Sequence, residues 1–365
     1  MRQFRGTIDG HYYQIDYPER IAFAYNNNAI VFSSNDDSAF KYSVTVQDNA
    51  GYQEARTIEI ASFNHFAKAD ISLLFQLLFE TTVIINRDIK ATVTIKRGST
   101  TITSFECMVL FAVMNVGDRL QNFGIFSNPN AEHYERHITW FANFPFNISL
   151  LGINGATVYK RYDNMPYGTG QAIGSTTEGI QDITPDPDTV QNKFVIKIKQ
   201  GESTSTFDDT FDYTFFRLGS EDTIIVAERN NAKCGYYFRW LDNRGFWMQY
   251  LFDKGFVETT TETDGTSRSF YDEYNGITFE SKRLLGIDTT RTIKCCASSL
   301  DPERYEDVAT IASAAYVDMY LGRTDLGQDI WIPCNVKPAT HSKRDKFELN
   351  DFEIEVEFIE RSQRL

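Results

Sequence analysis

The chain has 365 residues, enough for two domains that each bury a core of their own. Its 50 acidic and 36 basic residues give a formal charge of -14, which excludes a protein that neutralises nucleic-acid phosphates over a broad basic face. Apolar residues make up 42% and charged residues 24%, which excludes both a disordered chain and a membrane bundle.

The N-terminal segment 1–7 has positive charges but no apolar run behind them, so we expect no secretory signal and cytoplasmic synthesis. No run approaches the ~20 consecutive apolar residues of a membrane-spanning helix, so we expect no membrane segment. The cysteines are odd in number and include no Cys-x-x-Cys pair. We therefore predict reduced core thiols at Cys107, Cys234, Cys295, Cys296 and Cys334.

Alternation of apolar and polar residues dominates the first half of the chain. It predicts half-buried strands at 42–46 and 91–95, with a hairpin turn at Arg97-Gly98-Ser99. Residues 70–79 differ, because their apolar side chains recur at helical spacing and Asp70 can accept amide hydrogens of a first turn. The pattern predicts one helix near 70–80 in an otherwise β-rich N-terminal domain, 1–183.

Residues 184–193 begin Thr-Pro-Asp-Pro-Asp, a composition that neither a helix nor a central strand tolerates. We interpret them as a linker or exposed loop between the N-terminal domain and a C-terminal domain, 194–365. A second polar stretch, 258–269, predicts a hairpin tip or loop.

The C-terminal domain is also predicted to be β-rich. Strands are expected at 194–199, 329–336 and 352–358, and an aromatic hairpin at 234–252 turns at Asp242-Asn243-Arg244-Gly245. A helix is expected near 302–314, because Asp301 suits the N-cap, Pro302 the first helical position and Glu303 the positive end of the helix dipole.

Two helices in matching surroundings indicate an internal repeat. Residues 56–62 precede the first helix and the similar residues 291–298 precede the second; both helices are followed by a β-like segment and a strand pair. The repeat predicts a mainly β fold with two similar domains and one flanking helix in each. The alternative is chance, because β-rich sequences reuse Thr, Ile and Ala freely.

Two groups of residues have types and spacings that could carry chemistry. His133 and His137 have the spacing of metal ligands on a helix, but the flanking sequence favours an extended chain and ordinary surface histidines. Asp208, Asp209 and Asp212 are a candidate acid/base group for sugar hydrolysis, but like charges on a loop usually face water. We therefore expect no enzyme, no catalytic residue, no metal and no cofactor.

Aromatic side chains on both faces of the hairpin are more than one buried face requires, so one face should be covered by a second domain, a neighbouring subunit or a ligand. A glycan could stack on Trp240, Trp247 or Trp331. The candidate subunit or domain interface comprises Trp140, Phe144, Phe146, Trp240, Arg244, Phe246, Trp247 and Tyr250.

Segments 140–146 and 238–247, Trp331-Ile332-Pro333 and the strand at 352–358 resemble tail or baseplate structural proteins of tailed phages that infect gut bacteria. The resemblance spans the chain from about Thr139 onwards. It implies two tail-tube-like domains, each a β-barrel or sandwich with one helix, in a protein of the virion tail that is synthesised in the host cytoplasm.

The resemblance also implies partners: copies of the same chain, as a trimer or a hexamer, and other tail or baseplate proteins. DNA would pass through the ring without specific binding. Glu353, Glu355 and Glu357 share one face of their strand and could line that channel and repel DNA. A solvated outer face explains the same alternation equally well. A receptor- or carbohydrate-binding module of a virion or cell surface is the alternative function.

Overall fold

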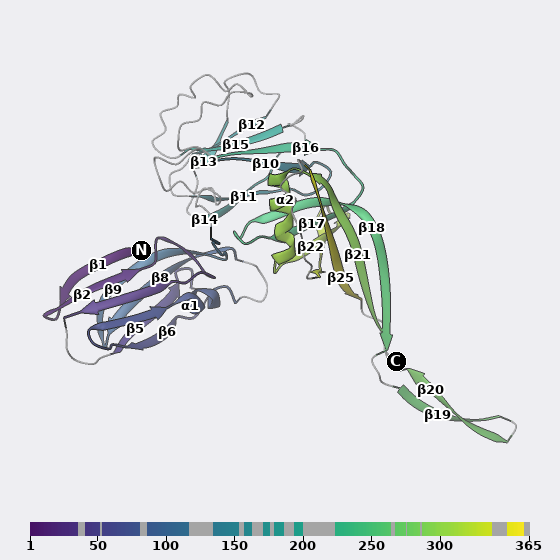
Figure 1. Cartoon of the computed structure of the whole chain (residues 1–365), viewed down its shortest axis with the longest axis horizontal. Helices are drawn as coiled ribbons and strands as arrows, with labels where there is room; N and C mark the ends of the chain where they lie inside the picture. The colour runs from purple at the N-terminus through teal and green to yellow at the C-terminus, as the bar shows by residue number, and fades with distance from the viewer. Residues whose placement is uncertain are drawn as a thin grey trace. The chain divides into compact units, whose positions relative to one another are not determined.

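The computed structural model (Figure 1) is mainly β, as predicted, whereas the two similar barrel or sandwich domains stay a prediction. It divides into two compact units, each assembled from separate stretches of chain: unit 1 from Met1–Arg136, Ile148–Val226 and Asp242–Phe246, and unit 2 from His137–Asn147, Ala227–Leu241 and Trp247–Leu365. The structure describes residues 1–35, 41–51, 53–80, 86–116, 134–152, 157–162, 171–175, 179–185, 193–199, 223–263, 267–274, 276–284, 287–337 and 349–360.

Two sheets share one core in unit 1. Side chains of both sheets, among them Tyr13, Phe32, Tyr42 and Val93, are almost fully buried together. The first sheet has the order β1 (Arg2–Ile8), β2 (His11–Tyr17), β4 (Ala29–Ser34) and β7 (Phe66–Asp70). The second has the order β3 (Ile21–Phe23), β9 (Thr100–Leu110), β8 (Asp88–Arg97), β5 (Lys41–Asp48) and β6 (Arg56–Ala61), with the predicted turn between β8 and β9.

Helix α1 (Ser72–Leu77) lies within the predicted range and packs into the same core through Leu74 and Phe75. The Oδ1 atom of Asp70 accepts a 2.9 Å hydrogen bond from the Ser72 amide, as the sequence predicted. Further strands of the middle of the chain form two more sheets. They are β10 (Tyr134–Phe141), β16 (Thr223–Asn230), β15 (Lys193–Lys199), β12 (Thr157–Tyr162) and β13 (Gln171–Ser175) in one sheet, and β11 (Ile148–Gly152) with β14 (Gly179–Ile183) in the other.

Unit 2 is built on one sheet of seven strands. Their order is β23 (Asp329–Pro333), β22 (Val317–Arg323), β17 (Tyr236–Leu241), β18 (Trp247–Thr263), β21 (Ile287–Leu300), β25 (Asn350–Glu360) and β24 (Asn335–Val336). Helix α2 (Pro302–Ala309) and the 3-10 turn after it, Thr310–Ser313, confirm the predicted helix near 302–314. The Asp301 carboxylate caps the helix by accepting a 2.9 Å hydrogen bond from the Arg304 amide.

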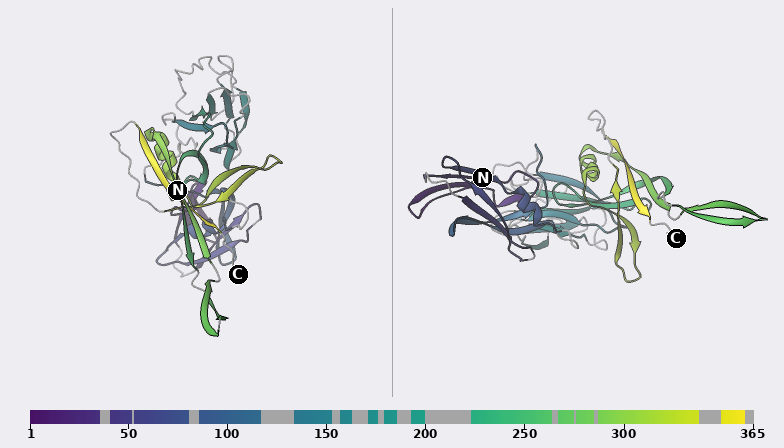
Figure 2. Two further views of the ribbon diagram at one scale, coloured as in Figure 1. Left: turned by 90° about the vertical axis from the view of Figure 1, so that its right-hand side faces the viewer. Right: turned by 90° about the horizontal axis from the view of Figure 1, so that it is seen from below.

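The prediction of a hairpin tip or loop at 258–269 is wrong for residues 258–263 and 267–269, which are strand, and residues 264–266 lie outside the described residues. Residues 258 to 263 belong to β18, where Glu258 pairs with Thr292 and Thr263 with Ile287 of β21. Threonine is β-branched and favours strands, and a strand that is solvated on both faces needs no apolar alternation. The chain continues into β19 (Ser267–Tyr274) and β20 (Ile277–Leu284), which Figure 2 shows as a two-stranded hairpin with no third described strand beside it.

The repeated segments occupy different positions in the two units. β6 is an edge strand that pairs with β5 alone, whereas β21 lies in the middle of its sheet between β18 and β25. Of the predicted linker 184–193, residues 186–192 lie outside the described residues, so this boundary stays a prediction.

Candidate functional sites

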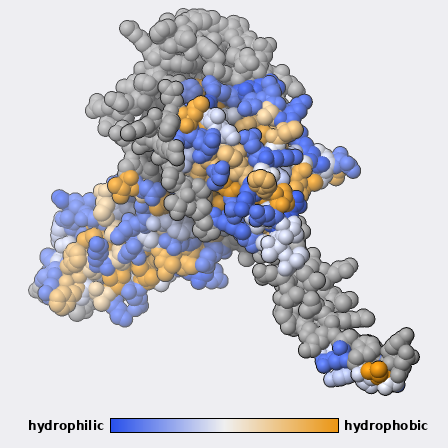
Figure 3. Space-filling model, turned by 45° about the vertical axis from the view of Figure 1, so that its right-hand side comes forward, coloured by the Kyte–Doolittle hydropathy of each residue, from blue (hydrophilic) through white to orange (hydrophobic). Residues whose placement is uncertain are grey.

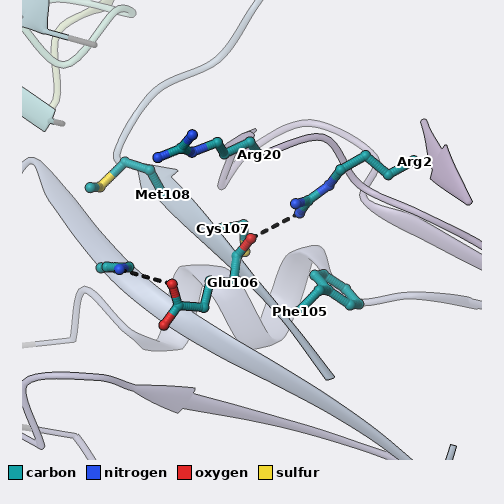
Figure 4. A pocket seen from close by; sticks show the side chains of 7 residues that line it. Arg2, Arg20, Phe105, Glu106, Cys107 and Met108 are labelled. Carbon is teal, nitrogen blue, oxygen red and sulfur yellow. Dashed lines mark hydrogen bonds and ion pairs between the residues drawn. The ribbon is translucent and has the colours of Figure 1, made fainter. Parts of the chain in front are cut away.

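A pocket of about 340 Å³ lies on the surface of unit 1 and is drawn in Figure 4. Three cationic side chains and one carboxylate surround it, and its remaining lining is apolar or thiol. The lining residues are Arg2 of β1, Arg20, Lys90 of β8, and Phe105, Glu106, Cys107 and Met108 of β9. The pocket is thus a locally basic site in an acidic protein.

Two hydrogen bonds and two ring contacts hold the guanidinium of Arg2 in place. Its Nε donates to the carbonyl of Pro18 (3.1 Å) and an Nη atom donates to the carbonyl of Glu106 (2.9 Å). The same group lies over the rings of Tyr17 and Phe105, with its carbon 5.1 and 5.4 Å from their centroids. Arg2 is therefore a positioned cation, and no carboxylate of the described residues forms an ion pair with it.

The Glu106 carboxylate pairs with Lys90 and not with Arg2. The Lys90 Nζ lies 2.8 Å from Glu106, and the Asn49 amide donates a 3.1 Å hydrogen bond to the same carboxylate. The hydrogen bond from Lys90 lowers the pKa of Glu106, so the group stays ionised. Burial raises the pKa of the Cys107 thiol to about 12, so this thiol is not a nucleophile at neutral pH.

An arginine between two indole rings forms a second candidate site, on unit 2. The guanidinium of Arg239 on β17 lies 4.9 Å from the ring centroid of Trp247 and 4.3 Å from that of Trp331. Asp318 fixes it with an ion pair of 2.8 Å. Both indoles are partly exposed. This Trp247–Arg239–Trp331 cluster brings together two of the three tryptophans predicted to contact glycans.

The third, Trp240, is fully buried in the core of unit 2 and offers no ring surface to a ligand. Trp140, Phe146 and Phe246 are also buried. Of the remaining predicted interface residues, Phe144, Trp247 and Tyr250 are partly exposed, and the nearly buried Arg244 is 2.6 Å from Asp242 within the hairpin turn.

The two aromatic segments that the sequence singled out cover each other. Phe144 stacks on Tyr237 with ring centroids 4.5 Å apart, and the Tyr237 hydroxyl donates a 2.6 Å hydrogen bond to the Pro145 carbonyl. Burial raises the pKa of Tyr237 well above 10, which keeps this donor protonated. The part of the hairpin's second face around Tyr237 and Leu251 is therefore covered by residues of the same unit.

The acidic face of β25 is partly neutralised by lysines. The Lys294 Nζ lies 3.1 Å from Glu355, and the Lys337 Nζ lies 3.8 Å from Glu357. The hydrogen bond to Glu355 is the main cause that raises the pKa of Lys294, which keeps the lysine charged. Glu353 is exposed beside them. The face is of mixed charge, and its predicted role in a channel stays a prediction.

Of the predicted metal and acid/base groups, His137 alone lies within the described residues. His137 lies on β10, an extended segment as expected, with its Nδ1 3.9 Å from Glu228. His133 and Asp208, Asp209 and Asp212 lie outside the described residues. Within the part of the chain that is described, no group of three or more His, Cys, Asp or Glu side chains is arranged to hold a metal ion, and no helix is long and apolar enough to cross a bilayer.

The basic pocket was not predicted, although the sequence holds a signal for it. Every second side chain of β1 faces inward, and Arg2 lies on the same face of the strand as Phe4 and Ile8. A charged residue in the apolar phase of a strand needs a special environment. The other lining residues come from distant strands, and no local pattern could bring them together.

Comparisons with known proteins do not place the chain in a family. No protein-family model matches it, and no curated protein does. Among solved structures, it is similar to the FN1–FN3 domains of chicken CNTN1, with 9% sequence identity over 87% of this chain and 96% of that chain and a TM-score of 0.19. A match at this TM-score defines neither the fold nor the function.

Proposed function

We propose that this chain is a non-enzymatic structural protein of a phage tail or baseplate, which assembles with copies of itself into a ring around the DNA channel. The proposal includes two diverged tail-tube-like domains, one in each half of the chain. The resemblance of the aromatic segments to such proteins supports it, as does the mainly β fold with α1 and α2 each packed on sheet.

The β19–β20 hairpin is the observation that carries self-assembly. An isolated two-stranded hairpin is at best marginally stable in water, and this one has no third strand among the described residues. Tyr271 and Ile277 on it are 74% and 68% exposed. Figure 3 shows a hydrophobic group among hydrophilic atoms on this hairpin. A surface of another copy would cover these side chains and complete the hairpin's packing.

The adjoining part of β18 adds a pairing surface. β17 pairs with β18 only as far as Phe252, so residues 253–263 have an open edge on that side among the described strands. Phe256 and Val257 are exposed there, next to a β-bulge. Open strand edges are templates for pairing between chains. Closure of three copies would present six similar domains around the channel, and closure of six would present twelve.

Removal of the hairpin tests this proposal. Residues 264–286 are replaced by Asn-Gly, because Thr263 and Ile287 are paired and a two-residue turn joins paired residues in register. Light scattering coupled to size exclusion should find a closed trimer or hexamer for the full chain and a monomer for the deletion. The point variant Y271S/I277S should weaken assembly, and L326S, which changes an even more exposed leucine on the β22–β23 turn, should not. A full-length monomer at all concentrations would contradict the proposal.

The Trp247–Arg239–Trp331 cluster favours a second candidate function, glycan binding. Sugar rings stack on partly exposed indoles, and the Arg239–Asp318 pair supplies polar groups beside them. A glycan array probes this function. W331A should lose any glycan signal and keep its mass in solution, whereas an array signal that W331A leaves unchanged would remove this candidate.

A further inference from the structure

The Arg2 pocket has a chemistry that neither assembly nor glycan binding uses. Arg2, Arg20 and Lys90 all line it, and Figure 4 shows the side chains of Arg2, Arg20 and Glu106 around it. Glu106 is engaged by Lys90 and Asn49, and among the described residues Arg2 has carbonyl and aromatic contacts only. The pocket therefore holds more positive than negative charge.

Arg2 is prepared for an anion before any anion arrives. Two carbonyls and two rings fix its guanidinium, so little side-chain freedom would be lost on binding. A guanidinium donates through five N–H groups, and the hydrogen bonds to the Pro18 and Glu106 carbonyls leave further N–H groups for a planar oxyanion. A charge-assisted pair of this kind is stronger than a neutral hydrogen bond.

The apolar lining narrows the class of ligand. Phe105, Cys107 and Met108 are buried and contribute ring, thiol and thioether surface to the pocket. Contact between this lining and a hydrocarbon group removes apolar surface from water and favours binding. A fully hydrated inorganic ion provides no such contribution. A ligand with an anionic group on a short aliphatic chain can pair with the cations and also contact the apolar lining.

We infer that this pocket binds an aliphatic carboxylate, such as an acidic side chain or a small organic acid, with Arg2 as its principal contact. The inference is independent of the proposed function, because it uses contacts of unit 1 alone. Calorimetric titration of the full chain with glutarate at low ionic strength tests it, and inorganic phosphate of similar charge is the comparison ligand.

Variants on one strand provide a matched pair. R2Q should weaken glutarate binding about tenfold, the effect of losing one charged hydrogen-bond donor. R5Q removes the same charge from an exposed position on the opposite face of β1 and should leave binding unchanged. E106Q should tighten binding about fivefold, because it removes a like charge beside the ligand. A misfolded variant cannot produce that gain.

A second titration distinguishes a carboxylate carried by a protein chain from a free small acid. A blocked glutamate tripeptide that binds more tightly than glutarate indicates a carboxylate carried by a protein chain, and weaker binding indicates a free small acid. The inference is overturned if glutarate does not bind, if phosphate binds as tightly as glutarate, or if R2Q and R5Q have equal effects.

Discussion

The indole Nε1 of Trp240 donates a 2.8 Å hydrogen bond to the hydroxyl oxygen of Thr310, and so links the buried strand β17 to the turn that ends helix α2. The Thr310 hydroxyl in turn donates to the Asp307 carbonyl at 2.6 Å. Trp240 is fully buried, so its N–H has no access to water. The pair fixes how the helix lies on the sheet of unit 2.

Thr310→Val should leave that N–H without an acceptor and lower the free energy of unfolding by about 1–3 kcal/mol. Thr310→Ser keeps the acceptor and should lose only the contribution of a methyl group, about 0.8 kcal/mol. Urea unfolding followed by tryptophan fluorescence measures both. Equal destabilisation by the two variants would contradict a role for the hydrogen bond.

Cysteine reactivity should separate the thiols by burial. Burial raises the pKa of Cys107, Cys295 and Cys334 to about 12, so these thiols should react only after unfolding. Cys234 is exposed, so the prediction that it is a core thiol is wrong, and it should react first in the native protein. The partly exposed Cys296, whose pKa burial also raises, should follow slowly. A thiol-specific chromogenic reagent and peptide mapping give the order. Rapid native labelling of any of the three buried thiols would refute the prediction.

Asp88 should make stability depend on pH. Burial raises the pKa of its carboxyl above 3.8, although the Ile180 amide donates a 2.8 Å hydrogen bond to it. The folded state therefore holds this proton more tightly than the unfolded chain does, and the wild type loses stability as the pH rises from about 3.8 through the folded pKa.

Asp88→Asn keeps an oxygen for the Ile180 amide but does not titrate. The unfolding free energy of the variant relative to that of the wild type should therefore be higher at pH 7 than at pH 4. Urea unfolding of both proteins at each pH measures it. A difference that is the same at both values, or that moves in favour of the wild type, would show that Asp88 has no raised pKa.

Gly255 lies at the β-bulge in β18, and its lack of a side chain is required there. A Cβ atom would stand 2.2 Å from the Lys294 carbonyl oxygen, a backbone atom of the paired strand. Gly255→Ala should destabilise unit 2 by about 1–3 kcal/mol, the usual effect of forced overpacking. Gly276→Ala at the β19–β20 turn meets no atom and should cost about 1 kcal/mol through its positive φ alone. Thermal unfolding of both variants provides the comparison.

Sequence patterns located most elements whose signals are local. The cap at Asp301 and the proline after it located α2, and the alternation at 352–358 located β25. The polar run at 258–263 was wrongly predicted as part of a loop, because a strand that is solvated on both faces has the composition of a loop.

The candidate sites were harder to predict, because they depend on which strands become neighbours. Trp247 and Trp331 were singled out, but Arg239 between them was not, since β22 and β23 bring Trp331 beside β17 from about ninety residues away. Trp240 was placed at an interface, yet alternation in a strand with aromatics on both faces does not say which face is the core.

The interleaving of the two units constrains the order in which the protein can mature. Unit 1 is complete only with Asp242–Phe246, which leave the ribosome after Ala227–Leu241 of unit 2 have already emerged. Unit 2 must in turn wait for β25, which lies next to β21 in its sheet. Unit 1 therefore cannot finish folding before Ala227–Leu241 of unit 2 have emerged, and unit 2 cannot finish before nearly the whole chain is made, so a nascent chain would expose unpaired strands of unit 2 until late in translation.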